Sequence, residues 1–249
     1  MRINSIDRCF NIIELLSQHP QGGMRLSDIS AHLGLNSSTV HHILGTLVDR
    51  DYVIQHKNTK RYALGFAFLE IGHRIIDNID LRNIARPDIN ALHKLCGEAV
   101  HLSVLRGGKV IYIDIIRNPT GLSLATYIGF STDPHAAAGG KALLAGISDD
   151  EVTALYAGRP FKRYTDNTCG DLKALMAELN QIRQRGYAID NEEYYEGVRC
   201  VAAPIIVRGK TVASLSITGA VFTITLARIK AELAKMVMET AQAISKKMQ

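Results

Sequence analysis

The stretch from Arg25 to Gly65 constrains the fold of this chain more than any other part of the sequence. A short helix is predicted to open at Ser27, whose side chain can cap free backbone N–H groups. Ile29 and Leu33 recur at helical spacing on one face of that helix, and Gly34 ends it. This pattern predicts the first half of a helix-turn-helix.

A second helix follows the turn and carries a single apolar stripe. Asn36 or Ser37 can cap its first turn, and Val40, Leu44 and Leu47 recur at i, i+4, i+7 spacing. The opposite face is small or polar and has no acidic side chain, so it can approach a polyanion and reach base edges in a major groove. That face consists of Ser38, Thr39, His41, His42, Gly45 and Thr46.

A short hairpin with a basic tip comes next. Tyr52 to Ile54 leads into the tip, HKNTKR at residues 56–61, and Tyr62 and Leu64 return in strand-like alternation. Such a wing suits the phosphate backbone, so we predict a winged helix-turn-helix bound to double-stranded DNA. The alternative is an ordinary three-helix core with a polar surface. The residues predicted to contact DNA are Arg25, Ser37, Ser38, Thr39, His41, His42, Thr46, Lys57, Lys60 and Arg61.

Charge gives only modest support for nucleic-acid binding. The 249 residues carry a net charge of +5 with a pI near 9.0, and residues 1–65 hold seven Lys or Arg against five Asp or Glu. This small surplus predicts weak binding by a single copy, because each neutralised phosphate adds to affinity. Two copies side by side would bind more tightly, so a homodimer or homotetramer is expected.

The composition, 47% hydrophobic and 21% charged, is ordinary for a globular protein. No run of about 18 apolar residues occurs, and the first residues lack the apolar segment of a signal peptide. The four cysteines, Cys9, Cys96, Cys169 and Cys200, form no Cys-x-x-Cys pair. We therefore expect a cytoplasmic protein with no membrane association, no disulfide, no metal site and no cofactor.

Apolar periodicity continues on both sides of the helix-turn-helix. Residues 3–18 predict a first helix whose apolar stripe covers the other two. Residues 66–79 predict a helix too apolar for a plain spacer, which needs a partner surface in its own domain or in a second copy. Pro87 is expected to start a new helix and not to lie deep within one. The stripe of the first helix is Ile6, Phe10, Ile13 and Leu16.

The rest of the chain predicts a second domain in which hairpins alternate with helices. We expect a winged helix-turn-helix at 1–65, a linker helix at 66–80 and this second domain at 81–249. Paired strands with helices between them predict an antiparallel sheet covered by helices, an α+β fold. Helices are expected at 84–96, 135–145, 172–185 and 225–247, with a capping box at Ser148 and Glu151, and strands at 100–105, 110–116, 122–127, 200–207 and 211–218.

Small and polar groups in the second domain predict a ligand cavity. Alternation places Ser214, Ser216 and Thr218 on one face of a strand that a helix should cover. The run from Ala136 to Gly140 can present backbone N–H groups at the start of a helix, which suits a carboxylate. Asp190 and Cys200 would add an acceptor and a weak donor. Together these groups predict a small cup for a polar organic molecule, an acid.

Other interpretations of the same residues stay open. The Ala-Ala-Ala-Gly-Gly run can simply be tight helix-on-sheet packing, and the spacing around Lys141 lacks the phosphate-loop pattern. Cys200, Asp190 and His135 could form a nucleophile, its orienting acid and a base, although a buried structural thiol is the simpler interpretation. A metal site could be drawn from His93, Cys96 and His101, but these span a helix end and a strand start.

Three motifs, PHAAAGGKALLA, RGYAIDNEEYYEGVRCVAAPI and SLSITG, together with the winged helix-turn-helix, resemble the isocitrate lyase regulator (IclR) family of bacterial transcription factors. The resemblance implies a GAF-like effector domain, dimers or dimers of dimers, and control of catabolic genes by a small metabolite. It places effector contacts on matching positions of this sequence. These are Leu122, Leu124, Ala138, Gly139, Asp190, Cys200, Ser216 and Thr218.

Two positions depart from the family pattern. His42 stands where many relatives have Arg, so no operator sequence is carried over, and Thr218 stands where Ser is common, which narrows the cup by one methyl group. The expected function is a ligand-responsive repressor, not an enzyme, in which effector binding biases the spacing of two DNA-binding heads. The rivals are an enzyme with a Cys200 nucleophile and an architectural DNA binder whose second domain only oligomerises.

Overall fold

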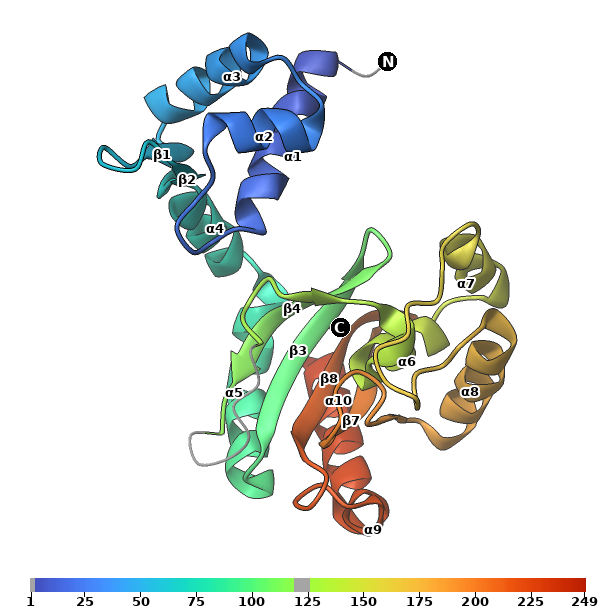
Figure 1. Cartoon of the computed structure of the whole chain (residues 1–249). Coiled ribbons are helices and arrows are strands. Elements are labelled where there is room, and N and C mark those ends of the chain that lie inside the picture. The colour runs from blue at the N-terminus through green and yellow to red at the C-terminus, as the bar shows by residue number, and fades with distance from the viewer. Residues whose placement is uncertain (1–2, 119–125) are drawn as a thin grey trace. The chain divides into compact units, whose positions relative to one another are not determined.

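The computed structural model describes residues 3–118 and 126–249. The chain divides into two compact units, Met1–Asn78 and Ile79–Gln249 (Figure 1). The predicted strand at 122–127 lies largely outside the described residues, and Thr126 and Tyr127 are not in a strand. Within the described residues, no helix is long and apolar enough to cross a bilayer.

The first unit is a winged helix-turn-helix. Helix α2 ends at Gly34, which adopts the left-handed conformation with φ of 62° and turns the chain into α3. Val40, Leu44 and Leu47 of α3 are buried as predicted. The elements are α1 (Asn4–Ser17), α2 (Leu26–Leu33), α3 (Ser37–Asp49), β1 (Val53–Gln55), β2 (Tyr62–Leu64) and α4 (Ala67–Asp77).

The predicted stripe of α1 is confirmed in its second half and wrong in its first. Leu16 is buried and Ile13 packs against the core, whereas Ile6 and Phe10 are 49% and 57% exposed and Ile12 and Leu15 take their place inside. Both sets recur at helical spacing, and periodicity alone does not say which of two apolar stripes meets the core. The exposed stripe is thus left without a partner among the described residues of this unit.

The predicted cap of α2 is also wrong. The helix begins at Leu26 after Arg25, with no side-chain cap, and the Ser27 hydroxyl instead donates to the Asp28 carboxylate at 3.2 Å. The following helix likewise has Asn36 at its N-cap position without a side-chain hydrogen bond. The backbone of this unit is therefore held by packing of its apolar residues more than by caps.

The second unit is built on a six-stranded antiparallel sheet with the order β5-β4-β3-β8-β7-β6. The strands predicted at 100–105 and 110–116, and those at 200–207 and 211–218, pair as hairpins and form its two longest ladders. The strands are β3 (Ala99–Arg106), β4 (Lys109–Ile116), β5 (Ser131–Thr132), β6 (Ala188–Asn191), β7 (Val198–Val207) and β8 (Lys210–Ala220).

Helices cover both faces of this sheet (Figure 1). On one face, α5 and α10 pack on the apolar side chains of β3, β7 and β8. On the other, α6 lies on β7 and β8 and is itself backed by α8. The helices are α5 (Asp80–Cys96), the 3-10 turn η1 (Pro134–Ala136), α6 (Ala138–Ala145), α7 (Asp149–Tyr156), α8 (Leu172–Arg185), α9 (Leu226–Arg228), the π-helical turn η2 (Ile229–Leu233) and α10 (Ala234–Lys247).

Several local predictions for this unit are confirmed. Ser148 and Glu151 form the capping box of α7, and α8 spans the predicted residues 172–185, after which Gly186 takes the left-handed conformation. The expectation for Pro87 is wrong, because Pro87 lies in the middle of α5. An interior proline costs about 3 kcal/mol, and the helix tolerates it because its buried face, which includes Ile89 and Leu92, packs on the sheet.

A β-bulge in β4 changes which face its side chains reach. Leu102 pairs with Asp114 and Ser103 pairs with Tyr112, so Ile113 is an extra residue on β4. Tyr112 consequently lies on the α6 side of the sheet, while Asp114 lies fully buried on the α5 side. There the Asp114 carboxylate pairs with Arg86 and Arg82 of α5.

Candidate functional site

The recognition helix of the first unit presents a polar face, as predicted. Its exposed residues include Ser38, His41, His42 and Thr46, while Thr39 is half-buried. None of these side chains is acidic, and the small Gly45 lies between them. The face is therefore narrow and free of like-charge repulsion against phosphate.

The wing carries its basic side chains at the tip. Lys57 and Lys60 are exposed, whereas Arg61 is half-buried and donates from Nη1 to the Gly23 carbonyl oxygen at 2.8 Å. Arg61 thus also ties the wing to the loop that precedes α2. Arg25 is exposed at the start of that helix. All of the predicted DNA-contacting residues belong to this unit.

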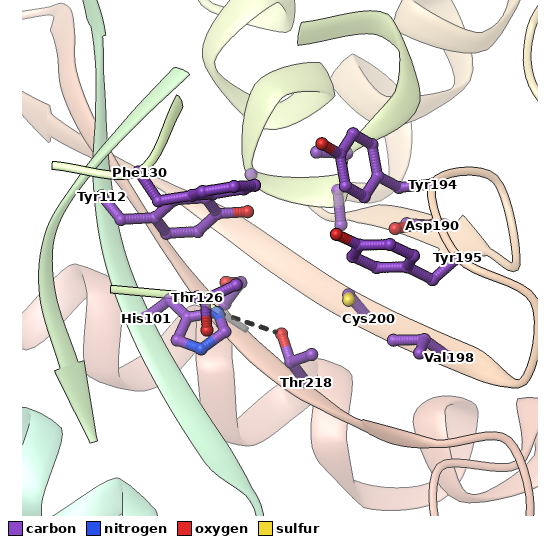
Figure 2. Close-up of a pocket in the computed structure, with 14 residues that line it drawn as sticks. His101, Tyr112, Thr126, Phe130, Asp190, Tyr194, Tyr195, Val198, Cys200 and Thr218 are labelled. Carbon is purple, nitrogen blue, oxygen red and sulfur yellow. Dashed lines mark hydrogen bonds between the residues drawn. The ribbon is translucent and has the colours of Figure 1, made fainter. Parts of the chain in front are cut away.

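The second unit contains a cavity of about 30 Å³ between the sheet, the start of α6 and the turn after β6 (Figure 2). Six of the eight predicted effector residues line it: Ala138, Gly139, Asp190, Cys200, Ser216 and Thr218. The other two, Leu122 and Leu124, lie outside the described residues. The polar residues visible in the sequence therefore predict where this cavity lies.

The floor of the cavity is the polar face of three paired strands. His101 on β3 lies opposite Ser216 on β8, and the Thr218 hydroxyl is 3.3 Å from His101 Nδ1 (Figure 2). Burial, with a smaller contribution from Arg117, lowers the pKa of His101 to about 4. The imidazole is therefore neutral near pH 7.

Asp190 and Cys200 face each other across β6 and β7. Burial and then the nearby Glu193 carboxylate raise the pKa of Asp190 to about 7, although the Glu193 backbone N–H donates to its Oδ1 at 2.7 Å. Burial and Asp190 together raise the pKa of the Cys200 thiol well above its ordinary value. Cys200 is thus an uncharged thiol, contrary to what a nucleophile needs.

Aromatic rings close the cavity, and sequence reasoning missed all of them. Tyr112 and Phe130 face Tyr194 and Tyr195 across the space in Figure 2, and the Phe130 and Tyr194 ring centroids lie 6.4 Å apart. The Tyr-Tyr pair four residues after Asp190 was the one available signal. Ala137, which also lines the cavity, belongs to the predicted run from Ala136 to Gly140. The lining residues that were not predicted are His101, Tyr112, Thr126, Phe130, Tyr194, Tyr195 and Val198.

The first residues of α6 face the cavity because glycine lets the helix lie close to the strands. A Cβ atom on Gly139 would lie 3.0 Å and 3.1 Å from the hydroxyl oxygens of Ser103 and Ser214. These two hydroxyls are themselves hydrogen bonded at 2.8 Å. The Ala138 and Gly139 amides are in the first turn, where backbone N–H groups lack intrahelical acceptors and favour an anion.

The alternative sites find no support in this arrangement. His135 Nε2 is hydrogen bonded to the Lys162 carbonyl oxygen at 3.0 Å, and His135 does not line the cavity with Cys200. Lys141 is buried, and its Nζ lies 2.6 Å and 2.8 Å from the two carboxylate oxygens of Glu193. Among residues 3–118 and 126–249, no cluster of three His, Cys, Asp or Glu side chains could hold a metal ion.

A winged helix-turn-helix combined with a sheet domain that encloses a polar cavity defines the class of ligand-responsive DNA-binding regulators. Residues 5–57 match the IclR helix-turn-helix domain, and residues 73–246 match the family described as bacterial transcriptional regulator IclR C-terminal. The chain belongs to the IclR family of bacterial transcriptional regulators, which confirms the resemblance seen in its motifs.

Individual relatives agree with this assignment. The HTH-type transcriptional regulators XynR and KdgR of Escherichia coli strain K12 are 35% and 33% identical to this chain, covering 82% and 87% of it and 80% and 82% of their own lengths. The crystal structure of Thermotoga maritima IclR superposes with a TM-score of 0.76 at 29% identity, covering 99% of both chains. The protein is thus a DNA-binding transcriptional regulator, and its relatives are regulators, not enzymes.

Proposed function

We propose that this regulator is a repressor of a catabolic operon that acts in the cytoplasm, where bacterial DNA lies, and senses a small organic or sugar acid. The observation that carries the proposal is the cavity itself. It joins six residues from four separate segments of the sequence, each predicted as an effector contact. A purely architectural domain has no need for buried hydroxyls and a carboxyl around a space.

In the DNA-binding unit, α3 would enter the major groove and the wing would follow the phosphate backbone. The test begins by recovering bound fragments of genomic DNA and measuring their affinity by fluorescence anisotropy. The Lys57→Ala, Lys60→Ala double variant should weaken binding to every sequence and reduce the slope of log K against log salt by about two.

Lys210→Ala supplies the matched control, because Lys210 is an equally exposed lysine in the other unit. It should bind DNA like the wild type. Equal affinity for the wing variant and the control would contradict the proposed role of the wing. Ser38→Ala and His42→Ala should instead change the sequence preference, because their side chains lie on the face of α3 that would reach base edges.

For the effector, the α6 amides of Ala138 and Gly139 and the Ser216 hydroxyl are the available donors to a carboxylate. The present space of about 30 Å³ accommodates about two water molecules. A carboxylic acid would need more room than this space offers, and Tyr195, at 41% exposed, is the most exposed side chain of the wall.

A direct test titrates carboxylic and sugar acids into the complex of protein and DNA. At least one acid should change the affinity for DNA, and the Asp190→Ala, Ser216→Ala variant should lose that response while still binding DNA. The acid-sensing proposal fails if no acid alters DNA affinity. It also fails if the variant responds like the wild type.

The unpartnered apolar side chains of the first unit support a homo-oligomer. Phe10 on α1 and Phe66 and Leu69 at α4 are 57%, 77% and 74% exposed, which is unusual for large apolar residues. A second copy would cover them and place two weakly basic heads on one operator. Leu69→Glu should therefore yield monomers in light scattering, whereas Leu95→Glu, at an equally exposed leucine of α5, should not.

A further inference from the structure

The charged and titratable side chains that line the cavity are unusual for a site that binds an acid. Its described lining contains one acidic residue, Asp190, one neutral imidazole, His101, and no lysine or arginine. Residues 119–125 have the sequence PTGLSLA, so wherever they lie they add no basic side chain. A bound carboxylate would therefore meet no cationic side chain in this wall.

The nearest cations are engaged elsewhere. Lys141 lies on α6 behind the cavity, and both oxygens of Glu193 neutralise its ammonium group at 2.6 Å and 2.8 Å. Arg117 is exposed and donates from Nη2 to the Thr126 carbonyl oxygen at 2.8 Å. What remains to attract an anion is the positive end of the α6 helix dipole, whose free backbone N–H groups are equivalent to about half a positive charge.

An ionised Asp190 would repel an acid in this space. Asp190 is buried, and it is surrounded by Cys200 of β7, by Glu193 and Tyr194 of the following turn, by Lys141 of α6 and by Tyr112 of β4. Two carboxylates sharing a poorly solvated site without a cation do not both stay ionised. The protonated carboxyl, by contrast, is a hydrogen-bond donor to the ligand.

We propose that the cavity binds a monocarboxylate together with one proton from solvent, which resides on Asp190, and that it excludes dicarboxylates. The inference rests on the proposed acid-sensing function and deepens it. The ligand carboxylate lies against the α6 amides and the Ser216 hydroxyl, and the protonated Asp190 donates to an oxygen of the same ligand. A second ionised group would have no donor-rich end of the cavity to occupy.

Isothermal titration calorimetry of the full-length protein tests this with pyruvate and D-gluconate as monocarboxylates and succinate as the dicarboxylate. Titrations at pH 7 in two buffers of different ionisation enthalpy give the number of protons taken up. Because the pKa of Asp190 is about 7, uptake near half a proton is expected there, with binding roughly tenfold tighter at pH 6 than at pH 8. Succinate should bind much more weakly than either monocarboxylate.

Two variants sharpen the experiment. Asp190→Asn keeps a donor but cannot take up a proton, so its binding should show no net uptake and no change of affinity between pH 6 and pH 8. Asp166→Asn changes an exposed acid in a loop outside the cavity and should retain the wild-type proton uptake. If Asp190→Asn does not fold, the proton uptake measured for the wild type in the two buffers still tests the proposal.

The possible failures are distinguishable. Monocarboxylate binding without proton uptake, or succinate binding as tight as that of pyruvate, overturns this inference and leaves acid sensing intact. The absence of binding by any of the three probes at both pH 6 and pH 8, in a protein that still binds DNA, counts against acid sensing and this inference together.

Discussion

Strand β8 supplies Leu215 and Ile217 to one face of the central sheet and Ser214, Ser216 and Thr218 to the other. All five residues are buried, so exposure does not distinguish the faces. The apolar face packs under α5 and α10, while the hydroxyl face lies under α6 and contributes Ser216 and Thr218 to the cavity. Simple alternation thus gives one strand a core-forming face and a cavity-lining face, and neighbouring substitutions should have unlike effects.

The largest contrast is expected between adjacent residues. Leu215→Ala should lower the free energy of unfolding by about 2–5 kcal/mol, because it leaves a void in the apolar core. Ser216→Ala should cost less than about 1 kcal/mol but abolish the response to acids. Chemical denaturation followed by circular dichroism measures both losses, and equal losses would remove the distinction between the two faces.

The second expected effect depends on pH. Asp190 keeps its proton up to about pH 7 in the folded protein, whereas the unfolded carboxyl releases it near pH 3.8, so ionisation lowers stability as the pH rises through this window. The unfolding free energy of the wild type, relative to Asp190→Asn, should therefore fall by roughly 2–3 kcal/mol from pH 5 to pH 8. A constant difference between the two proteins across that range would show that Asp190 does not titrate there.

A smaller effect concerns the buried hydroxyl pair on the polar face. Ser103 and Ser214 are hydrogen bonded at 2.8 Å, so each single alanine variant leaves one hydroxyl without its protein partner. Each should cost about 1–2 kcal/mol, while the double variant should cost about 1 kcal/mol less than the sum. Strict additivity in this double-mutant cycle would mean that the two hydroxyls act independently.

The smallest effect is expected for Thr218→Ser, which keeps the hydroxyl beside His101 and removes one methyl group from the cavity. The loss of stability should stay below about 1 kcal/mol. The wider cavity should improve the affinity for 2-oxobutyrate relative to pyruvate, as calorimetry can measure. An unchanged ratio would show that the methyl group does not limit ligand size.

The polar face of β8 could be predicted because alternation within a single strand is visible in the sequence. The aromatic wall as a whole could not, since its rings come from segments far apart in the chain, such as Tyr112 of β4 and Tyr194 after β6. At Tyr112, a bulge decides which face the ring reaches. Likewise α1 has two apolar stripes, and only the packed core shows that Ile12, not Ile6, lies inside.

The bulge in β4 also sets a cavity residue and an ion-pair anchor on opposite faces of the sheet, only two positions apart. Tyr112 touches the cavity, and two residues later Asp114 anchors Arg82 and Arg86. These arginines lie in the opening turns of α5, whose first residue is Asp80, two positions beyond the DNA-binding unit. A displacement of the Tyr112 ring would therefore act two residues away from the ion pairs that hold the first turns of α5, the helix that follows the DNA-binding unit along the chain.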